Sequence, residues 1–505
     1  MAGIKKITAI LFILRVVGML ISIISVTITA KFFGVSADKD CWVLALAVTT
    51  TILQAVWGPL NEIFRAKFVF IRENEGFEKA LSMTSSLIGF IFTVTILLGI
   101  MLLLFSQEIS TYIIGNIPPE SSSTFYVLLV AMIPTLLLTE LTRISSSILN
   151  AFDIFYIPEI VGFFTSTLHI FLILILAPVM GIYSLVVSTY ISTFTLLIVD
   201  IYYLQKNSIN IWGKLFKFKW CEASPFLLFA LPFFFPYFVG QINGLSEKYI
   251  AGLLGQGAIS SLDYANQFTK ILQSVLSGVL TTVMVPMLAK AFSNNETSEF
   301  SSIMKENMKV CMLIMIGVCG FLIGAAEPLC RFFFFRGKVS IEQLDVIIAL
   351  TRAYGLFFIG IFLYIVFGCA MLSSNRGKLY ASIGVFTQIL VTVLYIIGYT
   401  FINSLYVFPI SAGVAHFIAA VIMMYYTNEV RSWMLIRYIA LGFTILLTIS
   451  VLVYILNMFL YSELAIIQLI LNGVIVVVLM VIATLPLGYD MKPIVKQILK
   501  KYIKR

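Results

Sequence analysis

Long runs of hydrophobic residues, separated by short polar islands, fill almost the whole chain. A membrane-spanning helix needs roughly 20 apolar residues, and dividing the chain by that rule predicts about fourteen of them. Their ranges are 7–29, 42–64, 81–105, 124–148, 158–178, 182–205, 225–245, 252–289, 308–333, 341–372, 380–401, 405–427, 436–459 and 464–487. The eighth and tenth runs exceed the rule, so we expect tilt, kinks or extramembrane turns there. The pattern predicts an all-α polytopic membrane protein.

Composition narrows the possible functions. Hydrophobic residues make up 60% of the chain and charged residues 11%, whereas soluble domains are nearer a quarter charged. Neither a nucleotide-binding loop nor a metalloprotease or serine-hydrolase motif is present, and His169 and His416 are isolated in apolar runs. We therefore predict no enzyme, catalytic residue, metal site or cofactor. Uphill transport would draw on a coupling ion or the membrane potential.

Lysine and arginine set the expected orientation, because they favour the cytoplasmic side of a membrane. They collect in alternate islands such as 65–79 and 206–219 and in the tail from Lys492, whereas 107–123 contains none. Both termini are thus predicted to be cytoplasmic. The net charge of +9 is expected to face anionic membrane lipids, and no nucleic-acid partner is predicted.

One turn occurs twice in the sequence. "AKFFGVSADKDCW" begins at Ala30 and "AGLLGQGAISSLDYA" at Ala251, and both place two bulky residues, a Gly and an Ala in the same order. Each copy follows the first span of a six-span block, which predicts two parallel six-helix lobes around a central cavity. Alternatively, small residues recur because they cap and pack helix ends. The predicted lobes are 1–220, including a basic linker, and 221–432; 433–505 adds two helices and a basic cytoplasmic tail.

Four small or rigid residues are predicted to serve as gate or hinge. Gly34 and Gly255, in the two turns, would let the first two helices of each lobe approach closely at an outer gate. Pro232 and Pro236 share one span, and each removes a backbone hydrogen bond and bends a helix. Prolines are also ordinary in membrane helices, so the alternative to a hinge is that these prolines have no special role.

Polar residues within the spans indicate a cavity or a partner, because they are costly in hydrocarbon. Arg15 lies in the middle of the first span, and Arg352 near the beginning of the tenth. Both are candidates to bind an anionic substrate, since a guanidinium holds phosphate oxygens in pairs. Snorkelling to the interface is the alternative. Glu140 and Arg143 lie three residues apart on one helical face and are expected to pair.

Four segments carry a family resemblance. They read "RVVG…AKFFGVSADKDCW", "SSSILNAFDIFYIPEI", "INGLSEKYIAGLLGQGAISSLDYANQF…SGVLTTVMVPMLAKAF" and "EPLCRFFFFRGKVS". Their succession resembles the MviN/MurJ-type lipid-linked glycan flippases of the multidrug/oligosaccharidyl-lipid/polysaccharide exporter superfamily. The resemblance implies a cationic cavity between two lobes and a lipid-tail groove on two extra helices. It also implies that an undecaprenyl-pyrophosphate-linked glycan, lipid II or a related precursor, crosses the bacterial cytoplasmic (inner) membrane by alternating access.

The resemblance also implies substrate-binding residues. Arg15 falls on the family's first-helix arginine and Asp40 on the acidic residue after the first turn. In the second lobe, Asn243 matches the family's asparagine, while Glu247 and Lys248 stand where the family has an acidic–basic pair.

Two family positions depart from the pattern. The second first-helix arginine and its acidic neighbour fall at Ile21 and Ser22, and a later acidic–arginine pair falls at Asn266 and Gln267. Lys270, one helical turn from Gln267, and Arg352 are candidates to restore the missing charges. Asn266 remains a candidate substrate contact.

The departures leave other functions open. One is a flippase for O-antigen or exopolysaccharide repeat units, and another is an ion-coupled drug or metabolite antiporter with Asp200 or Glu140 as its acidic residue. A membrane scaffold without transport is the third. Besides the lipid-linked glycan, glycan polymerases or synthases are candidate partners.

Overall fold

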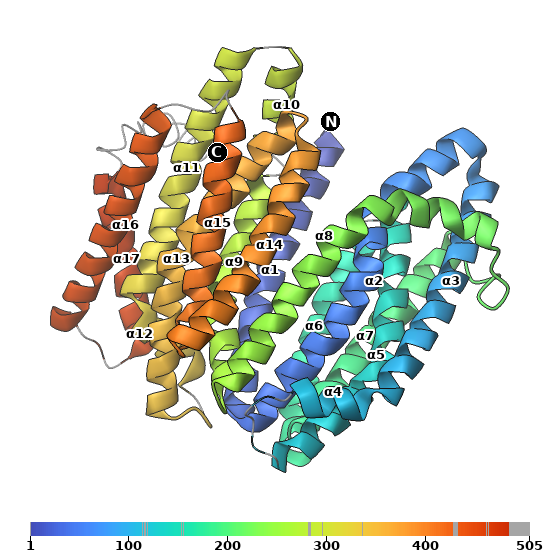
Figure 1. Ribbon diagram of the computed structural model, residues 1–505, viewed down its shortest axis with the longest axis horizontal. Helices are drawn as coiled ribbons and strands as arrows, with labels where there is room; N and C mark the ends of the chain where they lie inside the picture. Colours follow the sequence, from blue (N-terminus) through green and yellow to red (C-terminus); the bar gives the residue numbers. More distant parts are fainter. Residues whose placement is uncertain are drawn as a thin grey trace. The chain divides into compact units, whose positions relative to one another are not determined.

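The computed structural model of the chain is helical (Figure 1). It describes residues 2–113, 115, 118, 120–152, 154, 156–280, 284–294, 296–335, 337–427, 433–460, 462 and 464–483; of these, the side chains of 2–16, 120, 279, 433, 434 and 483 are not described. Over the described residues there are seventeen α-helices. The chain forms two compact units, Met1–Ser260 with Arg336–Val339, and Ser261–Phe335 with Ser340–Arg505.

The first unit is built around α2. Its helices are α1 (Ala2–Phe33), α2 (Ala37–Glu75), α3 (Phe77–Leu104), α4 (Ser106–Ile113), α5 (Glu120–Ala151), α6 (Tyr156–Met180), α7 (Tyr183–Lys206) and α8 (Trp220–Leu253). Helix α2 packs against α3, α5 and α8, while α5 packs against α7 and α6 against both α7 and α1. The fully buried Phe64 and Phe68 of α2 lie in this core. Ser36 begins α2 as its N-cap by accepting the N–H of Lys39 at 3.2 Å.

The second unit is built around α13 and α11. Its helices are α9 (Ala258–Val279), α10 (Val285–Ser293), α11 (Thr297–Gly324), α12 (Ala326–Phe334), α13 (Ile341–Ser373), α14 (Gly377–Phe401), α15 (Val407–Tyr426), α16 (Trp433–Phe459) and α17 (Ala465–Ala483). The first turn of α9, up to Ser260, belongs to the first unit. Helix α13 packs against α15 and α11, and α16 and α17 both contact α11 (Figure 1). At the α13–α15 contact, a Cβ on Gly360 would run into the backbone of Gly413. Absence of a side chain therefore permits this backbone approach.

The helices agree with the hydrophobic pattern. Within the described residues, twelve are long and apolar enough to cross a membrane, and α1 and α9 occupy the other two predicted runs. In the run 252–289, α9 ends at Val279 and α10 begins at Val285, with π-helical backbone at Leu280 and Met284. The run 308–333 divides at Ala325, whereas 341–372 is one continuous helix. The eighth run therefore changes its helical geometry, as expected, while tilt of the long helix in the tenth run stays a prediction.

Helix α8 belongs to the first unit by its contacts. Its Phe226 stacks on Phe64 of α2, with ring centroids 5.6 Å apart. Its Glu222 accepts hydrogen bonds from Lys214 of the linker and from Ser86 of α3. The beginning of α8 is thereby anchored on α3. The predicted lobes 1–220 and 221–432 rest on the repeated turn and not on contacts between helices. That division stays a prediction.

Candidate functional site

The two copies of the repeated turn meet within the first unit. The first joins α1 to α2 and the second joins α8 to α9. Asp40, in the first turn of α2, is fully buried. Its Oδ2 accepts the N–H of Gly257 at 2.5 Å, and its Oδ1 accepts the N–H of Ser260 at 2.7 Å. Because the first amides of a helix lack partners within that helix, Asp40 acts as a cap for the N-terminus of α9.

The glycines of the turns are required for different reasons. Gly34 has φ +60°, and a Cβ there would lie 2.5 Å from the carbonyl oxygen of Lys338. Gly257 has φ +83°, and its Cβ would stand 2.5 Å from Cγ1 of Val35. Gly255 has φ +120°, but no described atom lies within 4 Å of its Cβ position. Close packing therefore explains Gly34 and Gly257, whereas Gly255 is required by its backbone conformation; a gating role stays a prediction.

Two polar pairs connect α2 to α5. Nδ2 of Asn61 donates to Oε1 of the fully buried Glu140 at 3.0 Å. With the Gln54 amide oriented so that its oxygen faces the guanidinium, that oxygen accepts from both terminal nitrogens of Arg143, at 2.8 and 2.9 Å. The expected pairing of Glu140 with Arg143 is therefore wrong for the described side chains, because each has an amide partner on α2. Gln54 and Asn61 lie seven residues apart, about two helical turns, so both amides lie on the face of α2 that packs against α5, and this spacing is the sequence signal for the two pairs.

A third polar pair connects α5 to α7. The hydroxyl of Ser146 donates to Oδ2 of Asp200 at 2.5 Å. Asp200 is fully buried and is one of the two acidic residues that the sequence marks within the first lobe. At another point of the same seam, Tyr190 donates its hydroxyl to the carbonyl of Ala131 at 2.6 Å.

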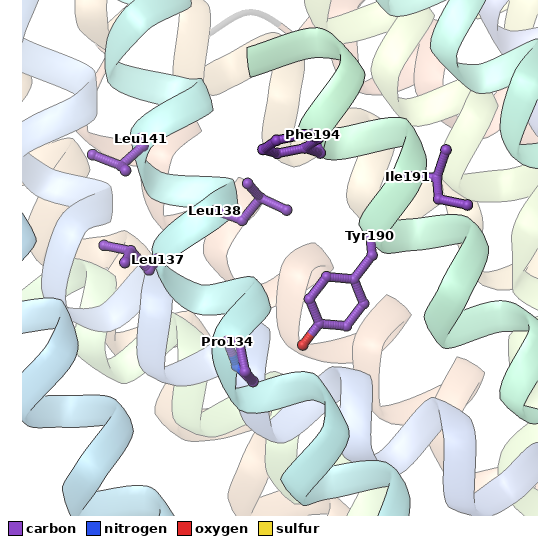
Figure 2. Close-up of a pocket in the computed structure, with 7 residues that line it drawn as sticks. All are labelled: Pro134, Leu137, Leu138, Leu141, Tyr190, Ile191 and Phe194. Carbon is purple, nitrogen blue, oxygen red and sulfur yellow. The ribbon is translucent and has the colours of Figure 1, made fainter. Parts of the chain in front are cut away.

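An apolar groove lies along this α5–α7 seam. It encloses about 410 Å³, and Figure 2 shows side chains from both helices around it. The lining residues are Pro134, Leu137, Leu138, Leu141, Tyr190, Ile191 and Phe194. The lining offers hydrocarbon and one aromatic hydroxyl, so it suits a hydrocarbon chain better than a polar solute.

Arg352 lies on α13 and faces α16. Its guanidinium carbon is 5.2 Å from the centroid of the Tyr454 ring, a cation–π contact. Among the described residues, no hydrogen-bond partner reaches its buried Nε, and no carboxylate forms an ion pair with it. A charge that stays ionised inside a membrane protein usually has an anionic or polar partner, and among the described groups the Nε of Arg352 has none.

The other predicted residues of the second unit have local partners. Lys270 forms an ion pair with Asp263, with Nζ and Oδ1 3.2 Å apart. Oδ1 of Asn266 accepts the hydroxyl of Thr269 at 2.6 Å. Lys270 is thus already paired at the position where we expect it to replace a missing family charge.

The remaining predicted residues lie in the first unit. Glu247 and Lys248 of α8 form an ion pair at 2.8 Å, and Asn243 is half-buried one turn earlier. Pro232 and Pro236 both lie inside α8, and a hinge there stays a prediction. Arg15 lies on α1, but its side chain falls outside the described part of the structure. A shared substrate role for these residues likewise stays a prediction.

No group of three or more His, Cys, Asp or Glu side chains among the described residues is placed to hold a metal ion. What the site offers instead is a buried carboxylate cap, three polar pairs and an intramembrane guanidinium. These groups bind and orient charges; none is arranged as a nucleophile beside a base.

The sequence matches one family across most of its length. The family model described as "Lipid II flippase MurJ" matches residues 29–480. The probable lipid II flippase MurJ of Buchnera aphidicola subsp. Acyrthosiphon pisum is 25% identical over 346 residues, or 66% of this chain and 66% of that protein, just under two thirds. The lipid II flippase MurJ of Burkholderia cenocepacia is 24% identical over 237 residues, 46% of each chain. The family match places the chain among transporters rather than enzymes.

Solved structures confirm the fold class. The structure titled "Lipid II flippase MurJ, inward closed conformation" matches with a TM-score of 0.78 at 18% identity, over 94% of this chain and 98% of that one. An inward-facing multidrug resistance transporter of the MATE family, in the MOP superfamily, matches with a TM-score of 0.68 at 14% identity, over 82% of this chain and 97% of that one. The predicted all-helical membrane fold is therefore confirmed.

Proposed function

This chain is a multi-pass membrane protein that belongs to the lipid II flippase MurJ family, and from that premise we propose that it is itself a lipid-linked glycan flippase. It turns an undecaprenyl-pyrophosphate-linked glycan, with lipid II as the first candidate, from the inner to the outer leaflet of the bacterial cytoplasmic membrane. The family match carries the proposal, because it covers the predicted first lobe from residue 29 onward, the whole predicted second lobe and most of the last two helices.

The substrate's pyrophosphate would require fixed positive charge within the protein. Arg352 supports that role, since its buried Nε has no partner among the described groups and a guanidinium binds two phosphate oxygens at once. Arg15 is the second proposed phosphate ligand, from its position on the first helix. Both termini would face the cytoplasm, following the distribution of Lys and Arg.

The transport cycle would act through the two outer turns. In the described state, Asp40 holds Gly257 and Ser260, so the two copies of the turn are bonded to each other. We assign this bond to a state in which the outer side is closed. Opening that side would break the bond and leave the amides to water, after which the glycan can leave.

A second substrate is favoured by one observation. The family's acidic–arginine pair falls at Asn266 and Gln267, and the nearby Lys270 is paired with Asp263. This part of the chain therefore has fewer unpaired cations than the family pattern. That difference suits a related lipid-linked unit, such as an O-antigen or exopolysaccharide repeat. The pyrophosphate anchor is common to both substrates, whereas the sugar differs.

The experiment is rescue of cells depleted of their own lipid II flippase. Rescue by this chain, lost in Arg15→Ala but kept in Arg331→Ala, supports lipid II. Arg331 is the control because it pairs with Glu327 on the partly exposed α12. Absence of rescue, with the protein present in the membrane, would exclude lipid II and favour the surface-polysaccharide unit. That second substrate is then tested by rescue of a repeat-unit flippase deletion.

A further inference from the structure

Glu140 and Asn61 form an isolated amide–carboxyl pair between α5 and α2. Glu140 has 0% of its surface exposed, and its Oε1 accepts Nδ2 of Asn61 at 3.0 Å. Neither residue takes part in the substrate steps proposed above. Their chemistry therefore requires its own explanation.

The second oxygen on each side chain is an acceptor without a donor. Among the described groups, neither Oε2 of Glu140 nor Oδ1 of Asn61 has a hydrogen-bond partner, and both atoms are buried. An ionised carboxylate is acceptor-only, and an amide carries one acceptor and one donor group. Rotating the Asn61 amide by half a turn would place its oxygen against Oε1, so that an acceptor would again face an acceptor. A proton on Oε2 converts one of the two acceptors into a donor.

The nearby cation does not neutralise Glu140 by pairing with it. Arg143 is the charged group whose field acts on Glu140, but its guanidinium nitrogens are bonded to Gln54. An ionised Glu140 would therefore be a buried anion with one amide hydrogen bond, an arrangement that proteins avoid. The neutral acid avoids this cost.

Besides Arg143, no described cation acts on Glu140. On α2, Arg72 donates to the carbonyl of Ala151 and Lys67 lies over the rings of Phe70 and Phe229, while on α7 Lys206 lies over the ring of Tyr203. From α2, Glu62 accepts the hydroxyl of Tyr237 instead. From α7, Asp200 is held by Ser146, and its own Oδ1 is buried with no partner among the described groups. Helix α3 has charges only in its first turn, at Glu78 and Lys79.

Two further helices contact α5 and carry titratable groups. Helix α4 has Glu108 in its first turn, and α6 has Glu159 in its first turn and His169 further along. His169 has its hydrogen bond with the backbone of Ser188 on α7. None of these groups is a donor to Glu140 in the described structure.

We infer that Glu140 is a proton-binding site: a carboxylic acid that donates from Oε2 to Asn61, and that loses its proton when α2 and α5 separate. No covalent bond is broken in this step except the O–H bond, and the proton passes to water that enters the opened seam. Resting on the proposed function, the site would link flipping of the glycan lipid to a proton gradient.

The first test needs no transport. Infrared difference spectra of the purified full chain at neutral pH are expected to show a protonated carboxylic C=O band that is absent in Glu140→Gln and present in Glu62→Gln. Glu62 is the matched control because it is exposed and lies next to Asn61. The same band in Glu140→Gln as in the natural chain would overturn the inference.

Folding of the variants is checked by their melting temperatures. Gln keeps an acceptor for Nδ2 and a donor for Oδ1 of Asn61, so Glu140→Gln is expected to melt within experimental error of the natural chain. Glu140→Ala leaves the Asn61 amide unpaired and is expected to melt at a lower temperature. A large loss in Glu140→Gln would contradict a neutral acid, because the ionised form is the one that Gln cannot imitate.

The second test measures coupling in proteoliposomes with a fluorescent undecaprenyl-pyrophosphate-linked glycan. At fixed membrane potential, one unit of pH difference is expected to change the flipping ratio by up to about tenfold for one coupled proton, and Glu140→Gln should remove that dependence. Flipping that ignores the pH difference in the natural chain would overturn the coupling. A carboxylic band without any flipping would overturn the proposed function and retain the proton site.

Discussion

The carboxylate of Asp40 accepts the backbone N–H of Gly257, a residue 217 positions further along the chain. With the bond to Ser260, it connects the two copies of a turn that the sequence repeats. Asp40, which the sequence predicts as a substrate contact, thus has a defined structural role in this state. A residue with both oxygens bonded to backbone amides changes its partners only when the turns move apart.

Asp40→Asn should destabilise the protein. Asn presents one acceptor where Asp presents two, so one buried N–H of the α9 cap loses its partner, at a cost of about 1–3 kcal/mol. The measurement is thermal unfolding in detergent, with Asp38→Asn as the control, because Asp38 is exposed on the same helical turn. Equal melting temperatures for the two variants would mean that the cap contributes nothing.

Gly34→Ala should cost more stability than Gly255→Ala. Both glycines have positive φ, so both variants carry backbone strain of about 1–3 kcal/mol. Only Gly34 also brings a Cβ against a backbone carbonyl, that of Lys338. Gly162→Ala is the control, since Gly162 is helical with no described atom near its Cβ position. If Gly255→Ala is the more damaging of the pair, the packing explanation for Gly34 fails.

Gly360→Ala should weaken the second unit. Its new Cβ would meet the backbone of Gly413, so α13 and α15 must separate, and overpacking of this kind costs about 1–3 kcal/mol. Gly473→Ala in α17 should be neutral, because no described atom lies within 4 Å of its Cβ position. Folded yield and melting temperature report the difference, and similar values for both variants would contradict the close contact.

Arg352→Ala should slow flipping at least tenfold, and Arg352→Lys should recover only part of the rate. A tenfold change corresponds to about 1.4 kcal/mol, well within the strength of a charge-assisted hydrogen bond. Lysine keeps the charge but not the paired geometry. Tyr454→Phe keeps the ring beneath the guanidinium and should flip normally. Rates are measured in proteoliposomes; an unchanged rate in Arg352→Ala would remove this residue from the phosphate site.

The sequence predicts the helices well because hydrocarbon imposes one simple rule. Every backbone group must bond internally in the membrane, so a long apolar run becomes a helix whatever its neighbours are. The end of α9 at Val279 and the division at Ala325 are less visible in the sequence, since apolar residues continue past both. Each new helix has a proline in its first turn, Pro286 and Pro328, where proline loses no hydrogen bond.

The polar partners could not be predicted in the same way. Glu140 and Arg143 lie on one face of one helix, and local spacing alone indicates that they pair. Their partners, Asn61 and Gln54, come from a helix about 80 residues earlier in the chain, and only the packing of α2 on α5 selects them. The same limit applies to Asp40, because its partners in the second copy of the turn are set by how that copy packs against the first.

The bond between Asp40 and Gly257 also has a consequence for biogenesis. Its 217-residue separation takes about 10–40 s to synthesise at 5–20 residues per second. During that interval α2 is already made, while the amides that Asp40 binds have not left the ribosome. The first compact unit is therefore completed late, after α8 has been inserted, and a nascent chain stopped before Gly257 would leave a carboxylate at the membrane surface without its partner.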